Sequence, residues 1–140
     1  MILYCTFEEL PALSAGAHRV LAETDDAAVV VAAPPQIVAD LEALAPRLTG
    51  DLSIGTLAEQ RSVARATAYI LADLKQRLDT TIVDENPASE ASVQAYFEYA
   101  NVLTFEDRLR RMGDQIAALI ELMTGSAPSE ETARTLSFPE

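Results

Sequence analysis

Hydrophobic positions recur at helical spacing along most of the chain and predict a mainly helical protein. In several stretches the apolar residues lie three or four positions apart, as expected for helices that bury one face. The predicted helices cover residues 6–23, 35–45, 56 to between 78 and 81, 87–103, and 104–124. The expected fold class is therefore a mainly α, single-domain helical bundle of about five helices with one or two short N-terminal β-strands; an α+β fold is the alternative.

The strands are predicted from two short runs of β-branched and apolar residues. The runs cover residues 1–5 and 28–33. Strands that alternate with helices in this way form a right-handed parallel pair. Because two strands are marginally stable alone, either the later helices cover this pair or a second subunit completes the sheet.

Capping residues mark several helix ends. Thr6 with Glu9, and Thr56 with Glu59, have the spacing of a capping box, in which the two side chains bond each other's backbone N–H groups. Gly125 follows the last periodic residue and is placed as a C-terminal cap. These signals predict helix starts near residues 6 and 56 and a helix end near residue 124.

The helix over residues 87–103 is predicted from apolar residues that share one face. They are Val93, Tyr96, Phe97, Ala100 and Leu103. We expect Asn86 and Pro87 to cap and open this helix. Tyr96 and Phe97 are assigned to the core, because aromatic residues at helical spacing are usually buried, and Tyr99 is a candidate surface contact.

From residue 105 onward the apolar residues follow a coiled-coil seam. Their spacing is 4, 3, 4, 3 and 4, which is the alternation that such seams use. The seam residues are Phe105, Leu109, Met112, Ile116, Leu119 and Met123. We expect them to form a homodimer interface, with burial inside the monomer as the alternative. The apolar face shifts near Thr104, which favours a kink or break over one continuous helix.

The length of 140 residues fits one domain. We expect a globular part over residues 1–125 and a polar tail over 126–140, in which Leu136 and Phe138 are the side chains that could attach the tail. No apolar run approaches the roughly 20 residues of a membrane span. The absence of an apparent export signal and the single cysteine lead us to expect a cytoplasmic protein with no membrane partner.

The charge distribution argues against nucleic acid as a partner. The net charge is −12, so the average surface repels polyphosphates. Residues 56–82 alone carry a net charge of +1, against −6 before them and −7 after them. A small basic cluster, formed by Arg108, Arg110 and Arg111, lies among neighbouring acids and is expected to be a solvated face.

The segment from residue 56 to 74 contains a possible DNA-binding pattern. It begins Thr-Leu-Ala-Glu-Gln-Arg-Ser-Val-Ala-Arg-Ala-Thr-Ala-Tyr. This resembles the helix-turn-helix of bacterial regulators, which often reads Leu-Ala-Glu, a turn, and then Ser-Arg-Ala-Thr-Val-Tyr. The resemblance implies a phosphate contact from Arg61 and groove contacts from Arg65, Thr67 and Tyr69. Ser62 stands where the turn usually has glycine, and one amphipathic helix without a turn explains the same residues.

Candidate catalytic and metal-binding residues are sparse. His18 is the only histidine and Cys5 the only cysteine, which excludes sites built from several of either. Ser14 lies one helical turn from His18, but a nucleophile in the middle of a helix lacks oxyanion donors. Asp84, Glu85 and Glu90 lack the ladder of ligands that a calcium loop requires. We therefore expect no catalytic residue, no metal ligand and no cofactor.

These observations give two functional hypotheses. The first is a non-enzymatic interaction or regulatory protein that acts through a helical surface, binds itself as a homodimer, and has another protein as a further possible partner. The alternative is a DNA-binding transcription regulator that uses residues 56–74. An enzyme based on a carboxylate pair has no support beyond the number of carboxylates.

Overall fold

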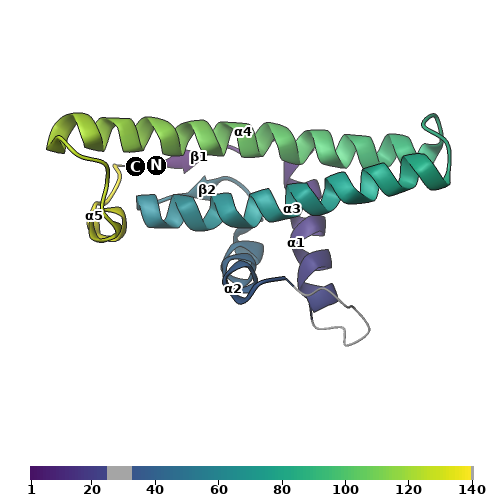
Figure 1. Cartoon of the computed structure of the whole chain (residues 1–140), viewed down its shortest axis with the longest axis horizontal. Coiled ribbons are helices and arrows are strands. Elements are labelled where there is room, and N and C mark those ends of the chain that lie inside the picture. Colours follow the sequence, from purple (N-terminus) through teal and green to yellow (C-terminus); the bar gives the residue numbers. More distant parts are fainter. Residues whose placement is uncertain (25–32, 140) are drawn as a thin grey trace.

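The computed structural model describes residues 1–24 and 33–139 and shows the expected mainly helical fold (Figure 1). In chain order the elements are β1 (Ile2–Leu3), α1 (Glu9–Thr24), α2 (Pro35–Leu44), the 3-10 helix η1 (Ala45–Arg47), β2 (Leu52–Ser53), α3 (Leu57–Asp84), α4 (Glu90–Thr124) and α5 (Glu130–Thr135). Among the helices of these residues, none carries an apolar stretch that could cross a bilayer.

The two longest helices, α3 and α4, form an antiparallel hairpin that organises the molecule (Figure 1). Helix α1 packs against both of them, and α2 packs against α3 and α1 on the same side of the hairpin. Helix α4 contains 35 residues, which corresponds to a length of about 52 Å. Because α1 and α2 lie against only part of the hairpin, its closed end projects beyond them as a pair of helices.

Helix α4 is continuous, so the predicted break near Thr104 is wrong. Thr104 lies inside the helix. Its hydroxyl donates hydrogen bonds to the Glu9 carboxylate and to the backbone oxygen of Asn101, and it does not cap a second helix. The helix begins at Glu90, later than expected. Ser89 caps it by accepting a hydrogen bond from the N–H of Ser92 at 3.1 Å. A shift in the apolar face changes what a helix packs against, but it does not interrupt the backbone hydrogen bonds.

The predicted Thr6–Glu9 capping box is complete, and the predicted Thr56–Glu59 box is formed in one direction. The Glu9 N–H donates to the Thr6 hydroxyl at 3.1 Å, and the Thr6 N–H donates to the Glu9 carboxylate at 2.9 Å. The Thr56 hydroxyl accepts from the Glu59 N–H at 3.2 Å, but the Glu59 carboxylate accepts from the N–H of Gly55 and not from that of Thr56. Gly125 ends α4 with a φ of 79°, a left-handed conformation that glycine adopts without steric cost. Local pairs of residues therefore define these ends.

Strand β1 pairs with β2 in an antiparallel arrangement, with Leu3 opposite Leu52. The expected parallel pairing with residues 28–33 is thus not the pairing that β1 makes. Residues 28–32 lie outside the described part of the chain, and Ala33 belongs to no strand. Both leucines are buried in the main core, so helices of the same chain cover one face of the small sheet.

The C-terminal tail packs onto the hairpin through α5. Ala133 is buried in a small core cluster, and the N–H of Phe138 donates to the carbonyl oxygen of Gly55 at 2.7 Å. Phe138 is half-buried, whereas Leu136 is exposed. Phe138 therefore attaches the end of the tail, and Leu136 does not.

Gly16, a poor helix former in the middle of α1, marks a close contact with α3. A Cβ atom built at this position would lie 2.5 Å from the Cγ2 atom of Ile70. We expect Gly16→Ala to lower the free energy of unfolding by about 1–3 kcal/mol through overpacking, although helix propensity alone favours alanine by about 1 kcal/mol. Urea denaturation measures the change. The control Ala15→Gly, at an exposed position of the same helix, should cost about 1 kcal/mol, and a stabilised Gly16→Ala protein would contradict the contact.

Candidate interaction surfaces

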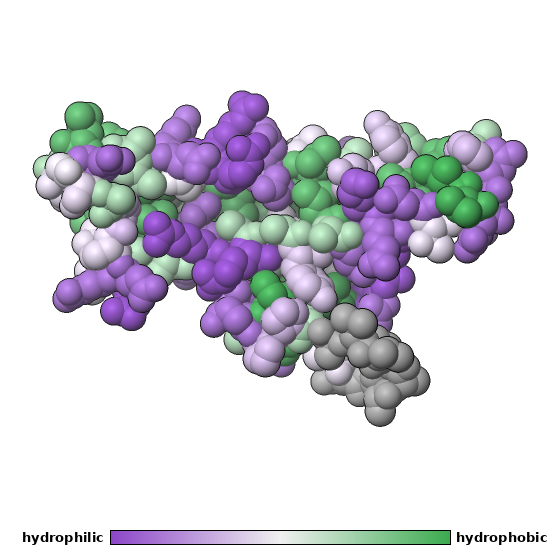
Figure 2. Space-filling view, in the orientation of Figure 1, coloured by the Kyte–Doolittle hydropathy of each residue, from purple (hydrophilic) through white to green (hydrophobic). Residues whose placement is uncertain are grey.

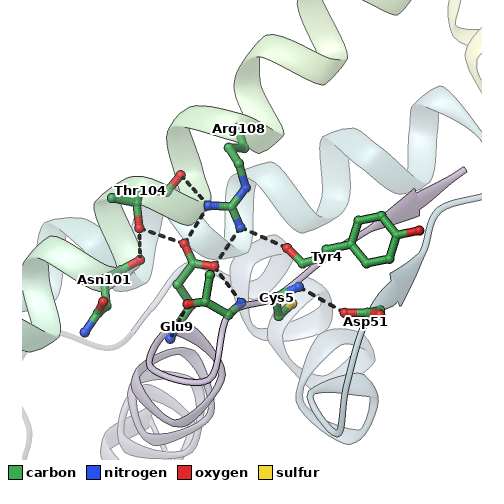
Figure 3. Close-up of polar contacts among 8 residues, drawn as sticks. Tyr4, Cys5, Glu9, Asp51, Asn101, Thr104 and Arg108 are labelled. Atoms are coloured by element: carbon green, nitrogen blue, oxygen red, sulfur yellow. Dashed lines mark hydrogen bonds and ion pairs between the residues drawn. The ribbon is translucent and has the colours of Figure 1, made fainter.

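The buried Glu9 and the partly exposed Arg108 form an ion pair between α1 and α4 (Figure 3). The two terminal nitrogens of Arg108 each donate to a different carboxylate oxygen of Glu9 at 2.6 Å. The Thr104 hydroxyl donates to the same carboxylate at 2.7 Å, and Arg108 also donates to the backbone oxygen of Tyr4 at 2.9 Å. Arg108 was expected to be solvated with its neighbours, but it connects three segments of the chain.

This network keeps Glu9 ionised. Burial raises the pKa of the carboxyl group, but hydrogen bonds from Arg108, from the Thr6 N–H and from Thr104 outweigh burial and lower the pKa from 4.5 to about 2. A carboxylate with such a low pKa is a poor general base near neutral pH, because it has little affinity for a proton. Glu9 is therefore suited to holding α1 against α4.

A second ion pair joins α2 to α3. Arg65 donates to both oxygens of the buried Asp40 carboxylate, at 2.9 and 3.2 Å. Ser62 and Gln36 donate to one of these oxygens at 2.7 and 3.1 Å. Burial raises the pKa of Asp40, but the bonds from Arg65, Ser62 and Gln36 lower it by more. Both buried carboxylates are thus fully engaged within the fold.

The residues that the helix-turn-helix resemblance singles out lie on one unbroken helix. Residues 57–84 form α3, so the turn that this resemblance requires near Ser62 is absent. Arg65 is paired with Asp40, and Thr67 is fully buried with its hydroxyl bonded to the carbonyl of Val63. Tyr69 packs against the main core, whereas Arg61 is half-exposed. Without a turn near Ser62 and with Thr67 buried, α3 differs from the recognition-helix arrangement that the resemblance implies.

The candidate catalytic residues are not arranged as a reactive group. The Nδ1 atom of His18 lies 2.7 Å from the backbone oxygen of Ser14, and His18 is exposed. Burial, together with the charges of Glu9 and Asp51, raises the pKa of the Cys5 thiol, which disfavours the nucleophilic thiolate. Among residues 1–24 and 33–139, no three His, Cys, Asp or Glu side chains are grouped as a metal site.

The predicted seam divides into a buried part and an exposed part. Three of its residues lie in the core of the monomer, where α3 and the N-terminal segments cover them: Phe105, Leu109 and Ile116. Met112 is half-buried and packs against the same core. Burial inside the monomer, the alternative to a dimer interface, therefore accounts for the three buried residues. Leu119 and Met123 remain exposed, by 57% and 79%.

The exposed part of the seam belongs to an apolar patch at the C-terminal end of α4. Leu122, which lies outside the seam pattern, is 82% exposed and is one helical turn from Leu119. We call Leu119, Leu122 and Met123 the end surface. Figure 2 shows hydrophobic residues gathered over this end of the hairpin. The seam pattern does not include Leu122. The low charge of the surrounding sequence could have indicated an apolar surface there.

A second apolar patch lies at the opposite end of α4. Tyr96 and Phe97 are 58% and 57% exposed, and Val93 and Leu103 on the same side are also exposed. The two rings meet edge to face, with their centroids 6.2 Å apart. We call these four residues the tip surface. The assignment of Tyr96 and Phe97 to the core is wrong, because α4 turns its other side toward α3; Tyr99 is the half-buried aromatic residue there.

The chain matches no protein-family model, no curated protein and no solved structure. We therefore base the functional inference on the surfaces and ion pairs described above.

Proposed function

We propose that the protein is a non-enzymatic interaction or regulatory protein that acts through its helical surface, and that it forms a homodimer. The end surface carries this proposal. Three large apolar side chains lie within two turns of α4 with more than half of each exposed. Full burial of such a side chain contributes about 1.5–3 kcal/mol, so covering the surface is favourable.

The charge around the end surface supports a second copy of the chain as the partner. Two molecules with a net charge of −12 repel each other unless they meet where charge is low. Residues 115–128 contain one charged residue, Glu121. It is two positions from both Leu119 and Met123, and residues at that spacing face different sides of a helix. The last turns of α4 therefore add little charge repulsion between two copies, and the exposed acids at this end, Glu130 and Glu131, belong to α5.

The buried polar groups support a non-enzymatic role. Glu9 and Asp40 are each held by an arginine and by further hydrogen-bond donors. Their charges are neutralised inside the fold, where they fix the positions of α1 and α2. Among the described residues, the exposed apolar faces of α4 are typical of surfaces that bind other proteins.

Sedimentation velocity between about 1 and 100 µM tests the dimer. We expect a species of twice the 15.1 kDa chain mass. Leu122→Glu should raise the dimer dissociation constant by about tenfold or more, because it places a charge in a desolvated contact. The matched control, Leu103→Glu, changes an exposed leucine of the same helix outside the end surface and should have little effect. A monomer throughout this range, or equal effects of both substitutions, would exclude the proposed interface.

A further inference from the structure

We propose that the tip surface binds a basic amphipathic helix of another protein, one with large apolar side chains along one face and lysine or arginine beside them. This binding is separate from the proposed homodimer, since it uses the opposite end of α4. The first support is the spacing of the exposed apolar residues. The exposed residues at positions 93, 96, 97 and 103, with the half-buried Ala100 between them, align on one side of the helix, which is the pattern of a helix-packing face.

The tip surface lies opposite the side of α4 that the protein already covers. Val102 and Phe105, on that covered side, are fully buried. Tyr96 and Phe97 point away from this packing and retain more than half of their surface. Exposed aromatic side chains are enriched among the residues that dominate the binding energy of protein interfaces. The spacing and the exposed aromatic side chains of the tip surface thus favour packing against another helix.

The negative charge at this end of the hairpin favours a partner helix with basic side chains. Residues 78–107 contain seven acidic residues and no lysine or arginine. Three of the acids, Asp84, Glu85 and Glu90, are exposed and make no ion pair with the described residues. Ile82 and Val83 are exposed among them. A partner that covers the apolar face therefore gains from cationic side chains along its edge.

The same charge disfavours other occupants. A second copy would bring two strongly acidic tips together, whereas α4 itself carries one charged residue, Glu121, over residues 115–128 at the end surface. Nucleic acids and anionic membranes are repelled by the unpaired carboxylates. An amphipathic helix with basic flanks can cover the apolar face and pair its cationic side chains with the surrounding carboxylates. Such helices bind apolar surfaces through apolar residues at helical spacing.

A designed peptide tests this inference directly. The probe is a fluorescein-labelled helix of about 18 residues, five turns, with leucine on one face and lysine on the other. Fluorescence anisotropy with the full chain at about 150 mM salt should show saturable binding. Each of two control peptides lacks one feature of the probe. The first has glutamate in place of every lysine, and the second has the composition of the probe in an order that does not gather the leucines on one face. Both should bind at least about tenfold more weakly.

Protein variants then locate the site. Tyr96→Ser combined with Phe97→Ser should weaken probe binding by about tenfold or more. Glu85→Gln with Glu90→Gln should also weaken it, whereas Glu130→Gln with Glu131→Gln, which changes the net charge equally at exposed positions of α5, should change it less than about twofold. Circular dichroism and thermal melting establish that each variant is folded.

The absence of saturable binding, equal effects of the two glutamate pairs, or equal binding of all three peptides would each overturn the inference. Loss of the dimer in the Tyr96 and Phe97 variant, without loss of probe binding, would instead identify a second copy as the occupant of the tip surface and would also overturn it. Failure of the probe to bind while Leu122→Glu still dissociates a dimer would reject this inference alone and leave the proposed homodimer intact.

Discussion

Replacement of Arg108 by alanine is expected to lower the free energy of unfolding by about 3 kcal/mol. The substitution leaves the Glu9 carboxylate buried with the Thr6 N–H and the Thr104 hydroxyl but without its positive partner. Removing one member of a buried ion pair costs about 3–5 kcal/mol. The Arg108 side chain is 39% exposed, so water can enter the space it leaves and keep the cost at the lower end of that range.

Arg111→Ala is the matched control for this experiment. Arg111 lies on the same helix and pairs with Asp107, but its side chain is 71% exposed, and pairs of that kind contribute at most about 1 kcal/mol. Both variants should be compared with the wild type by urea denaturation. Similar small decreases in unfolding free energy for Arg108→Ala and Arg111→Ala would show that water solvates the Glu9 carboxylate well enough without Arg108. Adding Glu9→Gln to Arg108→Ala should recover part of the loss, because it removes the unpaired charge.

Acid is expected to remove about 3 kcal/mol of stability that Glu9 provides. Hydrogen bonds and the charge of Arg108 hold its pKa at about 2 in the folded protein, against 4.5 in the unfolded chain. The unfolded state therefore binds a proton first as the pH falls. The contribution is complete above about pH 5 and is lost progressively as the pH approaches 2.

The measurement is the difference in unfolding free energy between the wild type and Glu9→Gln at several pH values. We expect this difference to shrink by about 3 kcal/mol between pH 6 and pH 2, because the variant lacks the titrating group. Glu8→Gln, which removes the neighbouring exposed carboxyl group, should stay within about 0.5 kcal/mol of the wild type at each pH. A difference between wild type and Glu9→Gln that does not depend on pH would contradict the role of Glu9.

The features that were predictable from the sequence depend on residues close together in the chain. The Thr6–Glu9 capping box and the Gly125 cap involve neighbours within four positions, so their residue types alone are informative. Helical periodicity located all four long helical segments for the same reason. The pairing of Arg108 with Glu9 joins residues 99 positions apart, and no local pattern indicates which acid an arginine will meet.

The location of the candidate surfaces was harder to predict, because periodicity identifies an apolar face without identifying what covers it. Tyr96 and Phe97 satisfy the same spacing rule as the buried residue Phe105, yet they face solvent. Which residues are buried depends on the side of α4 that faces α3 and α1, and this is a property of the assembled fold. Strand β2 was missed because two residues are too few to show alternation, and it is recognisable only through its pairing with β1.

The unbroken course of α4 fixes the separation between its two apolar patches. They lie about 40 Å apart along one helix axis, without a hinge between them in the chain. A dimer joined at its end surfaces would therefore be bivalent, with each tip surface held at a set distance from the joint. When a target presents two basic helices at a matching separation, the second contact becomes intramolecular and overall binding can strengthen by roughly 10²–10⁴-fold. The length of α4 would then select targets by the spacing of their binding segments as well as by their chemistry.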